Sequence, residues 1–500
     1  MKSYKILIFI ILLLLGLALM SMLFPRNGIR LGSVLLEFPT MEDVMGRAEE
    51  ELAEVEAEEE EAADTLSPEE LMELRLAALH AAKDSEFVAG MDGNPARFYL
   101  PNDDIEYLDP LFEALMAARQ HSTRIMYFGD SQLECDRITD VLRESLQSEF
   151  GGNGAGLLPA VQTIGTTTAR VSTWPELTRR VGFGAERQSG GSRRFGPLSQ
   201  VALVRGNATF SLTAIGGKSF PHSGSFRKIS VLMAGIGTLS ISQGDEDVEF
   251  ASQQDSSFTA MRVYSKTLPG SVSRATIKAE GQMEIFGIML DGGSGVSVDN
   301  IAMRGSSGTH FTSLESSTFT PFFRQNDVSL ILLQYGGNSV PYLKGGKSIS
   351  NYKRQMKSQI EYIKRISPNS RIIYVGPADM ATLDGETMRT YHQLPQIVDS
   401  LRDAALESGV AFWDMFRVMG GRGSMVRWVD ARPQLAGEDY IHFTPKGARR
   451  IANILSETID YYYKYYRFRK GLDKEELPAD TLSENEIQNT TYDSITVVNH

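Results

Sequence analysis

A serine near position 130 has the neighbours that an enzyme nucleophile requires. Ser131 ends the triplet Gly129-Asp130-Ser131, which directly follows an apolar run at 124–128 that reads as a buried strand. Open α/β folds place their sites at the carboxyl ends of such strands, so Ser131 is a candidate nucleophile. The alternative is a helix N-cap, because a serine hydroxyl accepts hydrogen bonds from the first N–H groups of a helix. Asp130 is expected to support the turn through hydrogen bonds.

A histidine in the last third of the chain is the candidate base. Of the seven histidines, only His442 closely follows an acid, Asp439, three residues earlier. Both lie on a loop that leads into the amphipathic helix predicted over 446–465. A carboxylate one turn away can fix the tautomer of the imidazole, which then takes a proton from a serine. The alternative is a capping aspartate beside a surface histidine.

Two further residues are candidate donors to an oxyanion. Asn338 follows Gly336-Gly337 at the end of the apolar run at 328–337, and its amide can point at a developing negative charge. Gly305 lies at another junction between a strand and a loop, where its backbone N–H can serve in the same way. Each segment also fits an ordinary turn.

The elements that carry these residues alternate between strand-like and helix-like stretches. The runs at 328–337 and 371–377 are continuously apolar, as in strands covered on both faces. Helical stretches are predicted at 350–366 and 387–408, and the helix at 446–465 closes the series. This alternation predicts an α/β fold, a parallel sheet flanked by helices.

A different pattern interrupts the α/β domain. Between about 156 and 295, short runs that alternate apolar and polar residues are separated by Gly, Ser, Asn and Asp. Such runs are typical of an all-β sandwich, for example a jelly roll. We therefore expect the α/β domain to comprise residues 96–155 and 296–468, with a β-sandwich insert at 156–295 that has its own core and selects a polymer without performing chemistry.

The two ends of the chain have distinct compositions. Residues 6–24 form an uncharged run long enough to cross a bilayer, so residues 1–30 are predicted to be a membrane anchor, with a cleaved signal peptide as the alternative. The catalytic body is then expected outside the cytoplasm, in a periplasm or extracellular. Residues 31–95 read as an acidic stalk, because twelve acidic residues and one basic residue lie between 42 and 64. The polar tail at 469–500 is predicted to be disordered.

Composition also limits the partners and cofactors. The net charge of −13 argues against nucleic acid, which requires clustered Lys and Arg. Cys135 is the only cysteine, which excludes a disulfide within the chain and a cysteine-based zinc site; it is expected to pack in a helix. No metal or cofactor is expected. The glycine-rich loop at 151–156 lacks the lysine of a phosphate-binding loop.

As a set, these residues resemble the SGNH, or GDSL, hydrolase family, which is named after a Ser, a Gly, an Asn and a His in four blocks. The matching segments are Gly129-Asp130-Ser131, Gly305 (with Gly308 close by), Gly336-Gly337-Asn338 and Asp439-Tyr440-Ile441-His442. Ser339 stands where the family commonly has an acidic residue. The resemblance covers roughly 100–155 and 296–468.

The resemblance implies a role for each matching residue. Ser131 is the expected nucleophile, His442 the base that takes its proton, and Asp439 the group that orients the imidazole. The backbone N–H groups of Ser131 and Gly305 and the side-chain amide of Asn338 form the expected oxyanion hole.

The insert narrows the resemblance to bacterial peptidoglycan O-acetylesterases, in which a sandwich similar to carbohydrate-binding modules splits the SGNH domain. This implies a serine esterase that removes O-acetyl groups from a cell-envelope glycan. One alternative is a glycan O-acetyltransferase that works with a membrane acyl-donor protein; another is a non-catalytic glycan-binding scaffold. Trp174 is a candidate for stacking on a sugar, although a structural role is the simpler interpretation.

Overall fold

The computed structural model describes residues 29–31, 34–36, 68–183, 192–243, 246–255 and 259–472. A short hairpin joins β1 (Ile29–Leu31) to β2 (Val34–Leu36). The rest of the predicted anchor, the acidic part of the predicted stalk and most of the predicted tail lie outside these residues. Across the described part of the chain, none of the helices combines the length and the apolar character needed to span a membrane.

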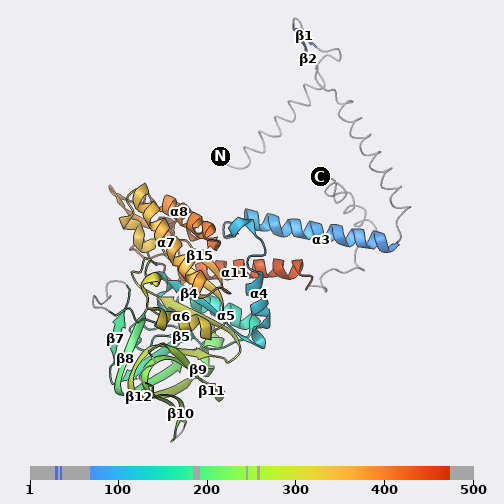
Figure 1. The fold of residues 1–500 in the computed structure, drawn as a ribbon. Coiled ribbons are helices and arrows are strands. Elements are labelled where there is room, and N and C mark those ends of the chain that lie inside the picture. The colour runs from blue at the N-terminus through green and yellow to red at the C-terminus, as the bar shows by residue number, and fades with distance from the viewer. Residues whose placement is uncertain are drawn as a thin grey trace. The chain divides into compact units, whose positions relative to one another are not determined.

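A six-stranded sheet forms the centre of the α/β domain (Figure 1). The first five strands in its spatial order are parallel, and the short sixth strand is antiparallel. The order is β13 (Gly295–Ala302), β4 (Ser122–Gly129), β14 (Val328–Gln334), β15 (Arg371–Val375), β18 (Ala411–Trp413) and β3 (Phe98–Tyr99). The α/β fold predicted from the alternating pattern is therefore present.

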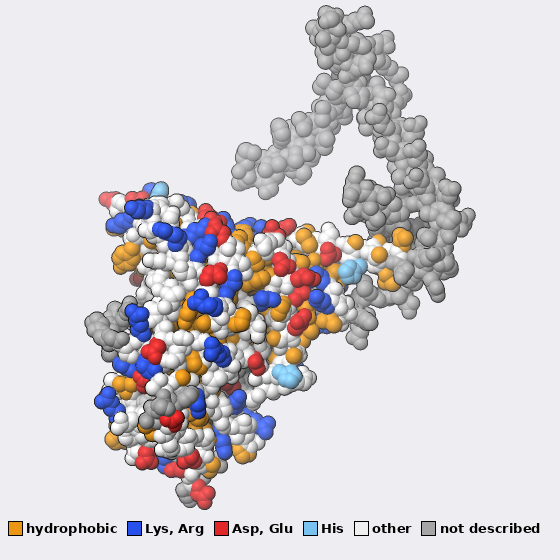
Figure 2. All heavy atoms as spheres, in the orientation of Figure 1, with side chains coloured by type: hydrophobic (Ala, Val, Ile, Leu, Met, Phe, Trp, Pro, Cys, Tyr) orange, Lys and Arg blue, Asp and Glu red, His pale blue; other side chains and the backbone are white. Residues whose placement is uncertain are grey.

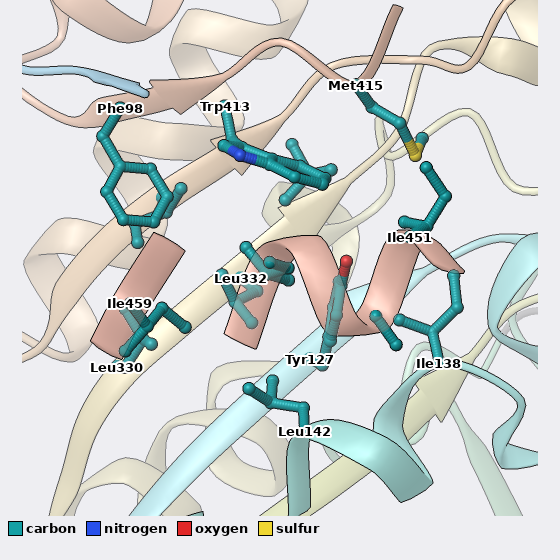
Figure 3. Close-up of a cluster of buried hydrophobic side chains, with 14 of the residues drawn as sticks. Phe98, Tyr127, Ile138, Leu142, Leu330, Leu332, Trp413, Met415, Ile451 and Ile459 are labelled. Carbon is teal, nitrogen blue, oxygen red and sulfur yellow. The ribbon is translucent and has the colours of Figure 1, made fainter. Parts of the chain in front are cut away.

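Successive side chains of the central strands enter two different cores, as the period of a strand requires. Tyr127, Leu330 and Leu332 point to one face of the sheet, where Trp413 joins them (Figure 3). The helices α4 (Asp109–Met116), α5 (Thr139–Phe150) and α11 (Pro445–Arg469) cover this face. The apolar side chains of these helices complete this core, and no described residue of the insert belongs to it.

The opposite face is covered by α6 (Ser316–Gln325), α7 (Gly346–Ile366) and α8 (Leu394–Glu407). The helix predicted over 387–408 begins only at Leu394. The preceding residues form β17 (Thr387–Thr390), which pairs with β16 (Ala381–Asp384). Gly385 turns this hairpin with a φ of +63°, a conformation that glycine adopts without a Cβ clash.

The α/β domain extends beyond its predicted limits at both ends. Phe87, in α3 (Pro68–Gly93), contacts the rings of Tyr461, Tyr465 and Phe468 of α11. A compact unit accordingly runs from Phe87 to Leu477, and residues 1–86 with 478–500 form a second unit. Helix α11 includes Arg469, the first residue of the predicted tail.

The insert is one antiparallel sheet that folds over on itself. Its strands are β5 (Gly156–Leu158), β6 (Ala169–Trp174), β7 (Thr178–Val181), β8 (Gln200–Ala214), β9 (Phe226–Gln243), β10 (Glu246–Gln253), β11 (Arg262–Val272) and β12 (Arg274–Asp291). Gly206, Gly281 and Gly237 face one another across the three longest strands, with φ of +96°, +138° and +159°. A Cβ on Gly281 would lie 2.4 Å from the carbonyl oxygen of Ile236.

This glycine row divides the long strands into two halves. Strand β11 pairs with β9 before the row and β10 pairs with β9 after it. Apolar side chains from both halves, among them Val231 and Ile241, share one buried core. The insert thus has a core of its own, built by one folded sheet in place of two separate ones.

The other face of the insert packs against the α/β domain. Leu157, Phe286 and Met289 pack in the same core as Met126 and Phe128 of β4. The insert and the α/β domain therefore share buried apolar area.

A buried ionic cluster lies where the insert joins the α/β domain. Arg124 of β4 contacts Asp299 of β13 at 2.6 Å and Asp291, the last residue of β12, at 2.7 Å. The carboxylate of Asp299 also accepts from the backbone N–H of Leu157 at 2.8 Å. Because paired charges in a core demand close geometry, this cluster sets where the insert leaves and rejoins the sheet.

Candidate active site

The turn after β4 holds Ser131 without using it as a helix cap. The capping residue of the 3₁₀ helix Ser131–Asp136 is Asp130, whose Oδ1 accepts from the backbone N–H of Gln132 at 3.0 Å. The Ser131 hydroxyl lies 2.7 Å from Nε2 of His442. The N-cap interpretation of Ser131 is therefore wrong, and the cap role belongs to its neighbour.

Ser131, His442 and Asp439 form a connected chain of hydrogen bonds. Nδ1 of His442 lies 2.6 Å from Oδ2 of Asp439, and Oδ1 of the same carboxylate accepts from the backbone N–H of Ile441 and of His442, each at 3.0 Å. A carboxylate on Nδ1 orients the ring so that Nε2 accepts from the serine hydroxyl. Asp439 therefore fixes the tautomer of the ring.

Hydrogen bonds from the histidine loop stabilise the negative charge of Asp439. Burial by itself raises the pKa of this carboxyl group. The hydrogen bonds from the backbone N–H and the ring of His442, and from the backbone N–H of Ile441, outweigh that effect and lower the pKa below its ordinary value. Asp439 is thus an anion at neutral pH.

Gln132 joins the serine turn to the histidine loop, a contact that sequence reasoning missed. Its Nε2 donates to the backbone oxygen of Ile441 at 2.6 Å, and its Oε1 accepts from the backbone N–H of Phe443 at 3.3 Å. Both neighbours of His442 are therefore held by the residue after Ser131. The only sequence signal is an amide directly after the candidate nucleophile.

The candidate oxyanion donors lie on the same cavity as Ser131. Gly305 and Asn338 both line it. Gly308 instead packs against the ring of Tyr335, with a φ of +77°. Nδ2 of Asn338 donates to Oδ2 of Asp130 at 2.9 Å and to the backbone oxygen of Ser306 at 3.1 Å. The amide is thus held in a fixed orientation from two sides.

Asp130 is buried beneath this group. Burial raises the pKa of its carboxyl group to about 6, against the opposing effects of the N–H of Gln132, the charge on His442 and the amide of Asn338. Its contacts agree with the supporting role expected for it: it caps the turn and holds Asn338.

The cavity over Ser131 has a volume of about 550 Å³ and two kinds of wall. The apolar side chains of Pro341, Tyr342, Pro377, Met380 and Met415 contribute to its lining. Tyr342 is 78% exposed, although large hydrophobic side chains are mostly buried in this protein. Charged side chains also line the cavity, namely Asp130, Glu134, Arg137 and Arg304.

The insert contacts the segment that holds Ser131 through a hydrogen bond to Asp136. The hydroxyl of Thr168 donates to the carboxylate of Asp136, the last residue of the 3₁₀ helix, and Arg143 of α5 contacts the same carboxylate at 2.6 Å. Arg143 and Asp136 are 0% and 2% exposed in their side chains. Within the described part of the chain, the insert contributes no side chain to the lining of the cavity itself.

Two single residues differ from their expected environments. Cys135 is half-buried near the end of the 3₁₀ helix Ser131–Asp136, where its φ of +61° is not helical. It does not pack in a regular helix, because the segment that holds Ser131 ends with two left-handed residues, Cys135 and Asp136. Trp174 is 69% exposed at the end of β6, so it is not a core residue and its ring is accessible.

The charged surface shows no field of one sign on the face in Figure 2. Basic and acidic side chains alternate over the α/β part and over the insert (Figure 2).

Known proteins share parts of this architecture. Residues 278–450 match the family model of GDSL-like lipases and acylhydrolases. The match begins inside β12 and covers the segments of Gly305, Asn338 and His442, whereas the Ser131 segment lies on the other side of the insert. No curated protein sequence matches the chain.

Among solved structures, a peptidoglycan O-acetylesterase has a TM-score of 0.61 at 19% identity, over 74% of this chain and 100% of its own. A carbohydrate esterase family 2 enzyme with a carbohydrate-binding domain from Myceliophthora fergusii has a TM-score of 0.28 at 10% identity, over 58% and 100% of the two chains. A family two carbohydrate esterase from Cellvibrio japonicus has a TM-score of 0.22 at 9% identity, over 59% and 99%. The second part of the α/β domain thus matches the GDSL-like lipase and acylhydrolase family, and the fold of the chain resembles that of the peptidoglycan O-acetylesterase.

Proposed function

We propose that this chain is a serine esterase that removes O-acetyl groups from a cell-envelope glycan, with peptidoglycan as the substrate. The observation that carries the proposal is the hydrogen-bonded chain from Ser131 through His442 to Asp439, with distances of 2.7 Å and 2.6 Å. Serine catalysis requires a nucleophile, an adjacent base and a group that orients the base.

The proposed reaction proceeds through an acyl-enzyme. Ser131 Oγ attacks the acetyl carbon while His442 Nε2 takes the hydroxyl proton, and the ring returns this proton to the sugar oxygen as the C–O bond breaks. Water then attacks the acetyl-serine with His442 again as base, and the ring passes this proton to Ser131 Oγ as the acyl–serine bond breaks and acetate leaves. Asp439 remains ionised throughout and stabilises the imidazolium.

The oxyanion is proposed to be held by the backbone N–H groups of Ser131 and Gly305 and by the amide of Asn338. Because Nδ2 of Asn338 is already bonded to Asp130 and to the carbonyl of Ser306, the oxyanion must share one of these donor positions. The amide is oriented before substrate arrives, which lowers the reorganisation needed in the transition state.

Three features support a glycan as the substrate. One solved structure with a similar fold is a peptidoglycan O-acetylesterase. Tyr342 presents an exposed ring at the cavity, and Trp174 presents one on the insert; such rings are suited to stacking on sugars. An envelope glycan also agrees with the membrane anchor expected at 1–30 and with a catalytic body outside the cytoplasm, both of which we retain as proposals.

The test is acetate release by the purified full chain from acetylated peptidoglycan and from 4-nitrophenyl acetate, each with and without a glycan acceptor. Hydrolysis of both substrates, with no acceptor-dependent transfer, is expected. Transfer that exceeds hydrolysis would identify an acetyltransferase that works with an acyl-donor protein. Glycan binding without any acetate release would identify a scaffold and overturn the proposal.

A further inference from the structure

Resting on the function proposed above, we infer that the cavity contains a subsite for a substrate carboxylate, formed by Arg137 and Arg304. The enzyme then prefers an acetylated sugar that bears a carboxylate over the same sugar without that charge. An amino sugar with a free lactyl carboxylate, as in a peptidoglycan strand from which the stem peptide has been removed, has this chemistry.

Both arginines belong to the cavity that contains Ser131. Arg137 follows the serine turn, and Arg304 directly precedes Gly305. The side chain of Arg304 is 67% exposed. An exposed positive group therefore lines the same cavity as Ser131.

The acidic residues of the cavity lie behind this positive surface. Glu134 contacts Nε and Nη2 of Arg304 at 2.6 Å each, but the Glu134 side chain is only 8% exposed. Asp130 is buried and holds Asn338. The carboxylate of Glu134 thus fixes the plane of the guanidinium, and solvent meets the arginine first.

Arg137 supplies a second positive charge. Its Nε donates to the backbone oxygen of Glu134 at 2.8 Å, and its Nη1 approaches the backbone oxygen of Phe443 at 3.4 Å. Within the described residues, Arg137 has only these carbonyl partners and no ion pair with a carboxylate. The carboxylate of Glu134 therefore pairs with Arg304, whereas Arg137 contacts the backbone oxygen of Glu134.

This arrangement suits an anion better than a neutral group. A guanidinium binds a carboxylate through parallel N–H donors, and such charge-assisted bonds are about twice as strong as neutral ones. Tyr342 offers an apolar surface in the same cavity. A sugar ring on Tyr342 and a carboxylate at the arginines would fix which ester reaches Ser131.

The experiment compares two substrates that differ only in charge. One is the O-acetylated amino sugar with a free lactyl carboxylate, and the other is its primary amide. We expect wild-type kcat/KM for the acid to exceed that for the amide about tenfold or more, as one charge-assisted hydrogen bond allows. Arg304→Gln leaves only the charge of Arg137 and should lower this ratio severalfold, and Arg304→Lys should retain more of it.

Arg389→Gln is the matched control. Arg389 of β17 is also 67% exposed and is paired with Asp384, but it does not line the cavity. This variant removes the same charge and should keep the wild-type ratio. If both variants lose the preference for the acid over the amide, the net charge of the protein, and not the subsite, sets that preference.

Equal efficiency of the wild type toward acid and amide would overturn the subsite and leave the esterase proposal intact. If neither compound is cleaved, calorimetric binding to Ser131→Ala decides the question. A Kd for the acid at least about tenfold below that for the amide would support the subsite and reject the esterase. Equal Kd values would overturn the subsite.

Discussion

The α/β domain and the insert place their polar groups differently. The strands β4 and β14 are buried almost throughout, and the loops at their carboxyl ends carry Ser131 and Asn338. In the insert, β8 and the first part of β12 mix buried and exposed residues, and none of the residues lining the cavity comes from these strands. Parallel strands converge their ends at one edge, whereas a folded antiparallel sheet offers broad faces. The first arrangement suits a reaction and the second a binding surface.

The two regions are nevertheless joined by buried contacts. Thr168 of the insert shares the carboxylate of Asp136 with Arg143, and Leu157 shares that of Asp299 with Arg124. Deletion of the insert would expose one face of the β4 core and leave both carboxylates short of a donor. Single substitutions therefore separate reaction from binding better than deletion does.

Ser131→Ala tests the reaction side with the largest expected effect. We expect ester hydrolysis to fall by at least about 10⁴-fold, because the nucleophile of a connected triad is lost. Initial rates on 4-nitrophenyl acetate measure this, and circular dichroism checks the fold. A residual rate within tenfold of the wild type would remove Ser131 from the site.

Asp136→Ala tests the junction between the two regions. The change leaves the guanidinium of Arg143 buried without its carboxylate, and such losses destabilise by about 3–5 kcal/mol. Urea unfolding measures the free energy of unfolding. Asp460→Ala, which breaks the exposed pair with Lys464 in α11, is the control and should cost less than about 1 kcal/mol. Equal losses would contradict a special role of the junction.

The free energy of unfolding should depend on pH because the carboxyl group of Asp130 titrates differently in the folded and unfolded states. Its folded pKa of about 6 lies above the value of about 3.9 of an unfolded aspartate. Its contribution to stability is therefore fully present below about pH 4 and is lost as the pH rises through about 6.

Asp130→Asn removes this titration and keeps an acceptor for the N–H of Gln132. The difference in unfolding free energy between wild type and variant should change by roughly 2–3 kcal/mol between pH 4 and 7, in favour of the variant at the higher pH. Urea unfolding at several pH values measures it. A difference independent of pH would show that Asp130 does not hold its proton more tightly in the folded state.

Trp174→Ala tests the binding side with the smallest expected effect. Loss of a stacking ring should lower the ratio of kcat/KM on acetylated peptidoglycan to that on 4-nitrophenyl acetate by about five- to tenfold, as roughly 1 kcal/mol per aromatic contact suggests. Leu383→Ala, at an exposed apolar residue of β16, is the control. An unchanged ratio for Trp174→Ala would place polymer binding elsewhere.

The parts that the sequence pattern predicts are those with local signals. Continuous apolar runs identify β14 and β15, and Asp439 and His442 are three residues apart on one loop. The contact of Gln132 with both neighbours of His442 has no such signal, because 309 residues separate Gln132 from Ile441. The folding of the insert sheet depends on Gly206, Gly281 and Gly237 lying in register, which no local pattern encodes.

The position of β4 in its sheet has a consequence for synthesis. Strand β4 lies between β13 and β14, and both neighbours follow the whole insert in the chain. A ribosome therefore releases β4 with two open edges and must complete the insert before either edge is covered. Unpaired strand edges favour aggregation, and pairing over such separations is slow. We expect chains stopped before residue 295 to be digested at 122–129 by protease, and chains released after residue 334 to be protected there.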